Sequence, residues 1–442
     1  MAYNDDNYII SQEGLLYFHY YDMVRFVDEN FLKDTELSVE EREKLTKFYE
    51  GRQKESDRFF GEGKGRNVIV VQMEAIQNFL INLEVGDKEV TPNLNRLVND
   101  FVYFNNLFFQ VAGGNTSDAE FLSNNSLYPV DNGSVYYRFP NNKFISLPSL
   151  LKKEGYYTSV YHAFEREYWN RDEFYKTILF DSYLSKDDFD NTEELGWGLS
   201  DKEFLRQTAE FLSQSEQPFY SFIITLSSHH PFSYFQEFDE IDAGELEGTL
   251  IGNYLEAAHY VDKAIGAFIQ DLKSKGLYDN SIIVLYGDHG AIQRDELELI
   301  SGLLQIEPNE PEWRKLQEVP LFIRWPGMQD AGVNSTVGGQ IDILPTICNI
   351  LGIKTPFAMG KDLFNTKREY AVFRNHDVVT KQFIYINAKE TIYDWNGNEL
   401  DLEEYIDEIN LLLNELEVSD IILENDAFKN INNNSINEVQ RK

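Results

Sequence analysis

The sequence predicts an α/β fold in which helices sandwich a central, mostly parallel sheet. Two short runs, residues 67–71 and 281–286, are apolar on both faces, as strands in the middle of a parallel sheet are. Strand and helix patterns alternate from about residue 66 to residue 365, which is typical of layered α/β proteins. With 442 residues, of which 42% are hydrophobic, the chain can bury a large core.

The expected elements follow from local patterns. Apolar runs rich in β-branched and aromatic residues predict strands at residues 67–71, 157–161, 219–226, 281–286 and 320–325. Stretches with helical patterning predict helices at residues 91–97, 147–154, 201–213 and 254–275. The first of these helices has Pro92 in its first turn, where a missing N–H is tolerated.

The character of the chain changes at both ends of this region. Residues 1–65 predict a charged, mostly helical lead-in that ends at a flexible glycine-rich hinge, residues 61–65. Residues 366–442 predict a small C-terminal α+β subdomain with an antiparallel sheet, and residues 66–365 are the main domain between them. The short strands and the helix of this subdomain are expected at residues 369–373, 382–386, 391–394 and 402–416.

Composition restricts the partners of the chain. The formal net charge is −36, from 75 acidic and 39 basic residues, so nucleic-acid binding is not expected. An anionic membrane surface would also repel the chain unless a tether held it there. No signal peptide and no apolar run long enough to cross a bilayer is visible. The single cysteine, Cys348, lies in an apolar stretch and is expected to be buried.

Three of the predicted strands end in side chains that can bind a ligand. Glu74 follows the first strand, His229 follows the third, and Asp288 and His289 follow the fourth. Ligands gather at the carboxyl ends of strands in such sheets, and carboxylates with an imidazole suit Mn²⁺, Mg²⁺ or Zn²⁺. The alternative is a turn with an ordinary surface Asp and His. Since one strand end alone carries an Asp-His pair, a single ion is expected.

A glycine-rich stretch followed by hydroxyl residues gives the second signal. Ser117 and Glu120 fit a capping box, so a helix is expected to begin here with Thr116 at its N-terminus. The N–H groups and dipole of a helix N-terminus favour anions, and a hydroxyl bound to a cation there can attack phosphorus. Helix capping without any chemistry explains these residues equally well.

The third signal is His162 followed by the stretch from Trp169 to Asp172. Arg171 can bind two phosphoryl oxygens at once, and Trp169 can form a wall for a small polyol. The alternative is a structural ion pair between Arg171 and Asp172 beside a packed tryptophan. By itself this motif is weak.

Several of these stretches resemble one known family. Residues 91–97 (TPNLNRL) and 281–290 (SIIVLYGDHG) resemble the sulfatase superfamily in general. More specifically, the chain is similar to the catalytic domain of the lipoteichoic acid synthase family over about residues 66–425, with the motifs in the family's order. The matching segments are QMEAIQNFLIN (72–82), TSDAEF (116–121), NSLY (125–128), WNRD (169–172), ITLSSH (224–229) and PF (231–232).

The resemblance implies a sulfatase-like catalytic domain with a covalent mechanism. It implies that Thr116 is the nucleophile, and that Glu74, Thr116, Asp288 and His289 bind one divalent cation, Mn²⁺ first and Mg²⁺ as the alternative. The implied donor is phosphatidylglycerol, whose headgroup passes to the threonine while diacylglycerol leaves. The glycerol phosphate is then transferred to a growing glycerol-phosphate polymer, lipoteichoic acid.

The resemblance also implies a substrate pocket and a location. His162, Trp169, Arg171 and His229 are expected to line the glycerol-phosphate pocket, with Arg171 and His229 also taking part in catalysis. The family carries membrane helices that this sequence lacks, with residues 9–26 as a linker to them. The domain is therefore expected to be tethered to the membrane in the full-length protein, at the extracellular face of a bacterial cytoplasmic membrane.

Three positions depart from the family's pattern. His-Gly-Asp is replaced by the sequence His-Ala-Phe ending at Phe164, so one pocket carboxylate is missing, and Asn115 and His230 stand in place of a lysine and a tyrosine. The Cys/Ser-x-Pro-x-Arg motif of sulfatases is absent, so sulfate-ester hydrolysis is not expected. Two alternatives stay open, a soluble phosphodiesterase or phosphatase of the same superfamily and an inert binding domain.

Overall fold

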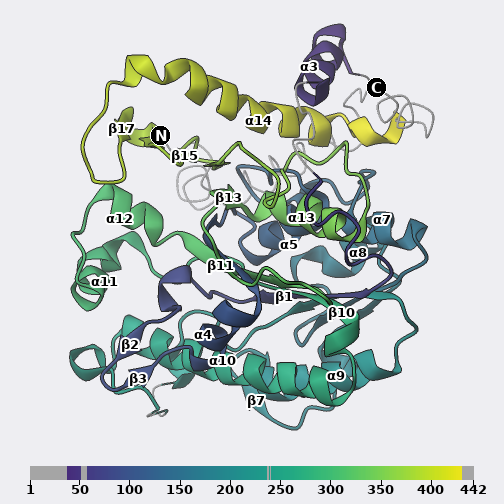
Figure 1. The fold of residues 1–442 in the computed structure, drawn as a ribbon, viewed down its shortest axis with the longest axis vertical. Helices are drawn as coiled ribbons and strands as arrows, with labels where there is room; N and C mark the ends of the chain where they lie inside the picture. Colours follow the sequence, from purple (N-terminus) through teal and green to yellow (C-terminus); the bar gives the residue numbers. More distant parts are fainter. Residues whose placement is uncertain (1–36, 51–56, 236–237, 239, 431–442) are drawn as a thin grey trace, which may run out of the picture.

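A central sheet of nine strands organises the molecule (Figure 1), as the computed structural model of residues 37–50, 57–235, 238 and 240–430 describes it. The strand order is β12-β4-β11-β10-β1-β9-β5-β6, and β13 pairs with β4. The strands are β1 Asn67–Met73, β4 Val102–Phe108, β5 Tyr157–His162, β6 Ser182–Leu184, β9 Phe219–Ile224, β10 Ser281–Gly287, β11 Glu318–Arg324, β12 Gly332–Asn334 and β13 Gly338–Gly339.

The pairing is mostly parallel, as the sequence predicts. Strand β1 is parallel to both β10 and β9, and β5 is parallel to β9 and β6. Strand β11 is antiparallel to its neighbours β10 and β4. The five predicted strands are therefore present, whereas β4 and β6, which the sequence did not indicate, extend the two sides of the sheet. The carboxyl ends of β1, β5, β9 and β10 lie at one edge.

Helices cover both faces of the sheet (Figure 1). Alternate residues of β1 belong to opposite cores: Val68 and Val70 pack in one, and Ile69 and Val71 in the other. Each such buried side chain stabilises the fold by about 1.5–3 kcal/mol. The helices of the first core are α5 Thr116–Asn125, α7 Leu147–Lys153, α8 Arg171–Thr177 and α13 Ile343–Leu351. Those of the second are α4 Pro92–Asp100, α9 Asp201–Gln214 and α10 Leu250–Ser274.

The C-terminal region adds a small antiparallel sheet and a long helix. The helix, α14 Ile406–Glu424, is tied down by an ion pair between Arg374 and Asp420. It also lies against α3 Val39–Glu50, which Figure 1 shows near its C-terminal half. The strands are β14 Tyr370–Val372, β15 Val378–Thr380, β16 Ile384–Ile386 and β17 Thr391–Tyr393, of which the sequence missed β15. The short elements elsewhere are β2 Glu84–Val85, β3 Lys88–Glu89, α6 Val135–Arg138, β7 Glu194–Leu195, β8 Gly198–Leu199, α11 Leu297–Leu304 and α12 Glu310–Lys315.

The expected flexible hinge at residues 61–65 is wrong. The N–H groups of Gly61 and Gly63 donate to the carbonyls of Asn349 and Ile350 at 2.9 and 2.8 Å, so this turn is fixed to α13. Gly63 is buried, and a side-chain carbon there would come within 2.7 Å of Ile282. The glycine-rich composition indicated flexibility, but composition alone does not reveal contacts with residues that are distant in the sequence. The expected linker at residues 9–26 lies outside the described residues.

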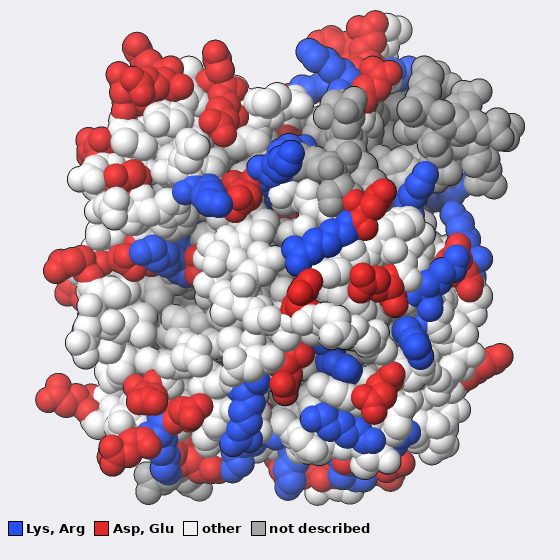
Figure 2. Space-filling model, in the orientation of Figure 1, with Lys and Arg blue, Asp and Glu red and all other residues white. Residues whose placement is uncertain are grey.

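Acidic and basic side chains are interspersed on the face of the molecule that Figure 2 shows. The chain as a whole is nevertheless strongly acidic, with a net charge of −36. Within the described residues, no helix is long and apolar enough to span a membrane.

Candidate active site

The candidate site lies where the parallel strands end. In the register of the sheet, Met73 at the end of β1 pairs with Gly287 of β10, and Gln72 pairs with Ile224 of β9. The residues that follow these strand ends are therefore brought together. They are Glu74 after β1, Asp288 and His289 after β10, and His229 after β9.

Glu74, Asp288 and His289 form the metal-ligand candidate that the sequence predicted. One ligand atom from each lies within 4.8 Å of the others. The Nε2 atom of His289 is 3.3 Å from Oε1 of Glu74 and 3.6 Å from Oδ2 of Asp288. Both carboxylates are almost fully buried. Burial and the neighbouring Glu74 carboxylate raise the pKa of Asp288 well above its usual value, so positive charge at this point is favourable.

Hydrogen bonds fix the carboxylate of Asp288 and the backbone of Glu74. Oδ1 of Asp288 accepts the N–H groups of Ala75 and His289, each at 2.7 Å. The backbone N–H of Glu74 donates to the hydroxyl of Thr225 at 2.9 Å, and its carbonyl accepts from Ser228 at 2.5 Å. Oε1 of Glu74 is buried without a hydrogen-bond partner among the described residues. An orphaned carboxylate oxygen beside a second carboxylate and an imidazole fits a divalent cation.

Thr116 lies beside this cluster at the first position of α5. Its hydroxyl Oγ1 is 3.3 Å from Oε2 of Glu74 and 3.4 Å from Nε2 of His289. Its carbonyl accepts from Gln72 at 3.2 Å, which ties the start of the helix to β1. Thr116 is 7% exposed, so a reactant must enter the cleft to reach it.

The expected capping box at the start of α5 is not formed. The hydroxyl of Ser117 donates to the carbonyl of Gly114, and Glu120 points away from the helix N-terminus to another partner. The carboxylate of Asp118 instead accepts the N–H groups of Ala112 and Gly114, each at 2.9 Å. The first turn of α5 is therefore ordered by Asp118, and the spacing of Ser117 and Glu120 matched the motif by coincidence.

Arg171, at the start of α8, lines the cleft but does not pair with Asp172. Its Nε and Nη2 atoms donate to Oε1 of Glu120 at 3.0 and 2.6 Å, and both residues are essentially fully buried. The hydroxyls of Tyr136 and Tyr175 donate to the other carboxylate oxygen. Nη1 of Arg171 is buried without a partner in the described structure. The edge of the guanidinium formed by Nε and Nη2 is therefore occupied, and the N–H groups of Nη1 remain for a ligand. The two-pronged phosphate binding expected from the sequence stays a prediction.

His162 and Trp169 occupy the same cleft. Nδ1 of His162 donates to the carbonyl of Ile224 at 3.0 Å, so Nε2 is left as an acceptor. Burial and the nearby Arg171 guanidinium lower the pKa of His162 to about 3, which keeps it neutral. Trp169 and Asn170 both have left-handed backbones, with φ of 58° and 57°. Such strained conformations occur where a fold must aim a side chain, here the indole beside Arg171.

His229 lies at the mouth of the cleft. Its ring lies against Trp197, with centroids 4.1 Å apart, and its Nδ1 donates to the carbonyl of His230 at 2.7 Å. The loop that carries it is held by Asp201, whose carboxylate accepts the N–H groups of Leu226 and Ser227. Nε2 of His229 is thereby left available for a ligand.

Sequence reasoning missed four residues that line this cleft. Phe164 follows β5 closely, so the strand-end rule could have found it, but Trp197 lies in a loop that no local pattern marks. The full lining is Glu74, Thr116, His162, Phe164, Tyr168, Trp169, Arg171, Trp197, Leu226 and His229.

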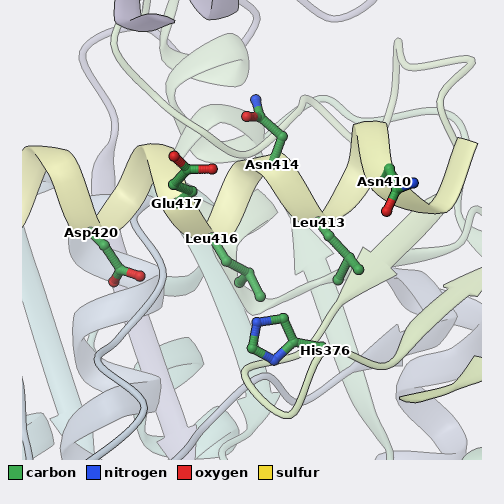
Figure 3. A pocket seen from close by; sticks show the side chains of 7 residues that line it. All are labelled: His376, Asn410, Leu413, Asn414, Leu416, Glu417 and Asp420. Carbon is green, nitrogen blue, oxygen red and sulfur yellow. The ribbon is translucent and has the colours of Figure 1, made fainter. Parts of the chain in front are cut away.

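A second groove of the described structure lies elsewhere. It has a volume of about 490 Å³ and lies between α14 and the turn that carries His376 (Figure 3). Its acidic members are engaged in ion pairs, Glu417 with Lys44 and Asp420 with Arg374. It shares no residue with the cleft at the sheet edge, so we place the chemistry at that edge.

Fold and site together define the class of protein: a phosphotransferase with the sulfatase and alkaline phosphatase fold. Residues 66–353 match the sulfatase family. The chain belongs to the sulfatase family and, within it, to the lipoteichoic acid synthases. The family and fold class predicted from the sequence are therefore confirmed, whereas the domain limits at residues 65 and 365 stay predictions.

Similar proteins cover almost the whole chain. Lipoteichoic acid synthase 2 of Bacillus subtilis (strain 168) is 36% identical over 436 residues, which are 96% of this chain and 67% of the relative. Lipoteichoic acid synthase of Staphylococcus aureus (strain USA300) is 34% identical over 451 residues, 98% of this chain and 69% of the relative. The crystal structure of the lipoteichoic acid synthase LtaP from Listeria monocytogenes superposes with a TM-score of 0.79 at 30% identity, covering 88% of this chain and 98% of LtaP.

Proposed function

We propose that the protein transfers the glycerol-phosphate headgroup of phosphatidylglycerol to a glycerol-phosphate polymer through a covalent intermediate on Thr116. The observation that carries this proposal is the position of the Thr116 hydroxyl. It lies at the N-terminus of α5, 3.3 Å from Glu74 and 3.4 Å from His289. Lipoteichoic acid in the names of the relatives supports the polymer acceptor. The proposed location of the reaction is the extracellular face of a bacterial cytoplasmic membrane.

One divalent cation is part of the proposal, Mn²⁺ in the first place and Mg²⁺ as the alternative. Glu74, Thr116, Asp288 and His289 would hold it, and the orphaned oxygen of Glu74 supports this assignment. When bound, such an ion lowers the pKa of a ligating hydroxyl and offsets phosphoryl charge.

The first half of the reaction forms one bond and breaks one. Oγ1 of Thr116 attacks the phosphorus, and the bond between the phosphorus and the diacylglycerol oxygen breaks. Oε2 of Glu74, at 3.3 Å, is within reach of the departing hydroxyl proton. His229 gives a proton to the diacylglycerol oxygen as it leaves. In the second half an acceptor alcohol attacks the phosphorus and gives its proton to His229. The bond between the phosphorus and Oγ1 of Thr116 breaks, and Oγ1 takes back the proton held by Glu74.

The other cleft residues position the headgroup. Nη1 of Arg171 and the positive end of the α5 helix dipole offset the charge on the phosphoryl oxygens. The lone pair on Nε2 of His162 accepts a hydrogen bond from a glycerol hydroxyl, because Nδ1 carries the proton. Trp169 packs against the carbon atoms of the glycerol.

Fluorescent phosphatidylglycerol in detergent micelles with Mn²⁺ tests the covalent step. The wild-type chain should release diacylglycerol, and its intact mass should rise by one glycerophosphoryl group when the reaction is stopped early. Thr116→Ala should show neither result. Ser117→Ala is the matched control, because its hydroxyl contacts Gly114 and Ser134 and not the cleft.

Activity that survives in Thr116→Ala would mean direct attack by water. The transferase assignment would then give way to a phosphodiesterase of the same fold. Wild-type protein that releases free glycerol phosphate even when a glycerol-phosphate oligomer is supplied in excess would point to the same hydrolytic function.

A further inference from the structure

A continuous row of aromatic side chains borders the cleft. The rings of Tyr137 and Trp169 have centroids 6.1 Å apart, and Trp169 and Tyr168 are 5.7 Å apart. Phe164 continues the row, 5.0 Å from Tyr168 and 5.8 Å from Trp197. We refer to these five residues, together with Tyr234, as the aromatic rim.

Tyr234 adjoins the row at Gly196, the residue that precedes Trp197. Its ring lies over Gly196, where a side-chain carbon would come within 3.1 Å of it. The glycine, with φ of 69°, therefore leaves the space that this ring occupies. The rim thus joins four separate segments of the chain: α6, the loop after β5, the turn between β7 and β8, and the loop after β9.

Four members of the rim are open to solvent although they are large. Tyr137 is 52% exposed, Tyr234 43%, Tyr168 41% and Trp197 36%. Within the described structure, no hydrogen-bond partner is found for the hydroxyls of these three tyrosines. Rings with an apolar body and a free polar tip are the side chains that occupy the boundary between lipid and water.

The rim is continuous with the site of the chemistry. Phe164, Tyr168, Trp169 and Trp197 also line the cleft that leads to Thr116. Since Thr116 is only 7% exposed, a donor must pass its headgroup between these rings to be attacked. If the donor is a diacyl lipid, as the proposed function holds, its acyl chains stay outside, at the level of the rim.

We infer that the aromatic rim docks on a lipid bilayer, with Tyr137, Tyr168, Trp197 and Tyr234 inserted at the level of the headgroups. This inference rests on the proposed function for the identity of the donor. It adds the surface by which the protein meets the membrane, and it assigns a role to Tyr137 and Tyr234, which do not line the cleft.

Electrostatic attraction cannot hold the aromatic rim on the bilayer. The chain has a net charge of −36, and the rim is flanked by the exposed acidic residues Glu165 and Glu167. Arg166 between them is engaged by Asp172 and Asp188. Anionic lipids therefore repel this surface, and burial of aromatic area must provide the binding energy. Docking is then expected to persist or strengthen as salt screens the repulsion, whereas electrostatic docking would weaken.

The experiment uses the chain and unilamellar vesicles of phosphatidylcholine with a minor share of phosphatidylglycerol. The variant is the double substitution Tyr137→Ser with Tyr234→Ser, which spares every residue that lines the cleft. Tyr157→Ser is the matched control, because Tyr157 is also an exposed tyrosine, at 37%, but lies at the start of β5, at the opposite end of the sheet. Binding is measured by vesicle flotation at low and high salt.

Cleavage is measured on two donors, phosphatidylglycerol in the vesicles and a short-chain phosphatidylglycerol below its micelle concentration. The double variant should bind vesicles about tenfold more weakly and cleave vesicle lipid correspondingly more slowly. It should cleave the monomeric donor at the wild-type rate, and Tyr157→Ser should match wild type in every assay.

Three outcomes would overturn the inference. Wild-type protein that cleaves the monomeric donor but does not bind vesicles has no docking surface of this kind. Binding that disappears at high salt would be electrostatic. A double variant that binds vesicles as tightly as wild type would show that Tyr137 and Tyr234 do not dock the bilayer. Failure to cleave either donor would instead contradict the proposed function, whatever the vesicles show.

Discussion

The carboxylate of Glu120 holds two of the three guanidinium nitrogens of Arg171 in an essentially water-free pair. Nη1 is the nitrogen that remains, on a side chain that lines the cleft. An arginine fixed in this way loses little conformational freedom when a phosphoryl group arrives, so Glu120 acts as a positioning residue for Arg171.

Glu120→Gln should therefore damage both stability and catalysis. The amide cannot balance the buried charge of Arg171, so unfolding in urea should show a loss of about 3–5 kcal/mol. Arg171→Lys removes the planar fork, because an ammonium cannot bind Glu120 and the ligand in the same geometry, and kcat/KM should fall about 100-fold. A Glu120→Gln enzyme with wild-type stability and kcat/KM would refute the positioning role.

Removal of one carboxylate should empty the proposed cation site. Asp288→Asn keeps an oxygen for the N–H groups of Ala75 and His289 but loses the charge, so Mn²⁺ affinity should fall by at least about 100-fold. Metal analysis after dialysis against Mn²⁺ measures it. Asp201→Asn is the control, since Asp201 is equally buried but binds backbone N–H groups of the His229 loop. Stoichiometric Mn²⁺ in Asp288→Asn would contradict the ligand set.

His162 should make the stability of the protein depend on pH. Its pKa is about 3 in the fold, against about 6.5 in an unfolded chain. Between these two pKa values the unfolded chain binds more protons than the folded chain. The contribution of His162 to the free energy of unfolding is therefore complete above about pH 6.5 and is lost as the pH falls, by up to about 1.4 kcal/mol per pH unit. His162→Asn cannot titrate and can still donate to the Ile224 carbonyl. Its unfolding free energy should therefore fall less than that of wild type from about pH 6.5 to 4, and parallel curves would contradict the assignment.

Local patterns sufficed for the centre of the fold and the metal-ligand candidates. The apolar runs of β1 and β10 could be recognised because both faces are buried, and parallel strands bring the residues after them to one edge. The pairing of Glu120 with Arg171 could not be predicted, because it joins residues 51 positions apart in the chain, and Glu120 also fitted a local motif. Strand β4 has an interrupted apolar pattern, with half-buried residues at its centre, and was missed for that reason.

The role of His229 can be separated into proton transfer and electrostatics by varying the leaving group. Its Nδ1 donates to a carbonyl, so Nε2 is the ring atom left to face the departing oxygen, and it can give that oxygen a proton from the imidazolium form. An alkoxide such as diacylglycerol needs that proton, whereas p-nitrophenolate leaves without one. His229→Gln retains an amide N–H but cannot transfer a proton. It should lower kcat/KM about 100-fold or more for phosphatidylglycerol and only a few-fold for a glycerol p-nitrophenyl phosphodiester.

Thr116→Ala is the control for both donors and should abolish cleavage of each, because the attack on phosphorus comes before the leaving group matters. Equal losses in His229→Gln for the two donors would mean that the imidazole acts on the phosphoryl charge rather than on the leaving oxygen. That result would leave the covalent step in place. The proton for diacylglycerol would then have to come from water or from the hydroxyl of Tyr168, which also lines the cleft.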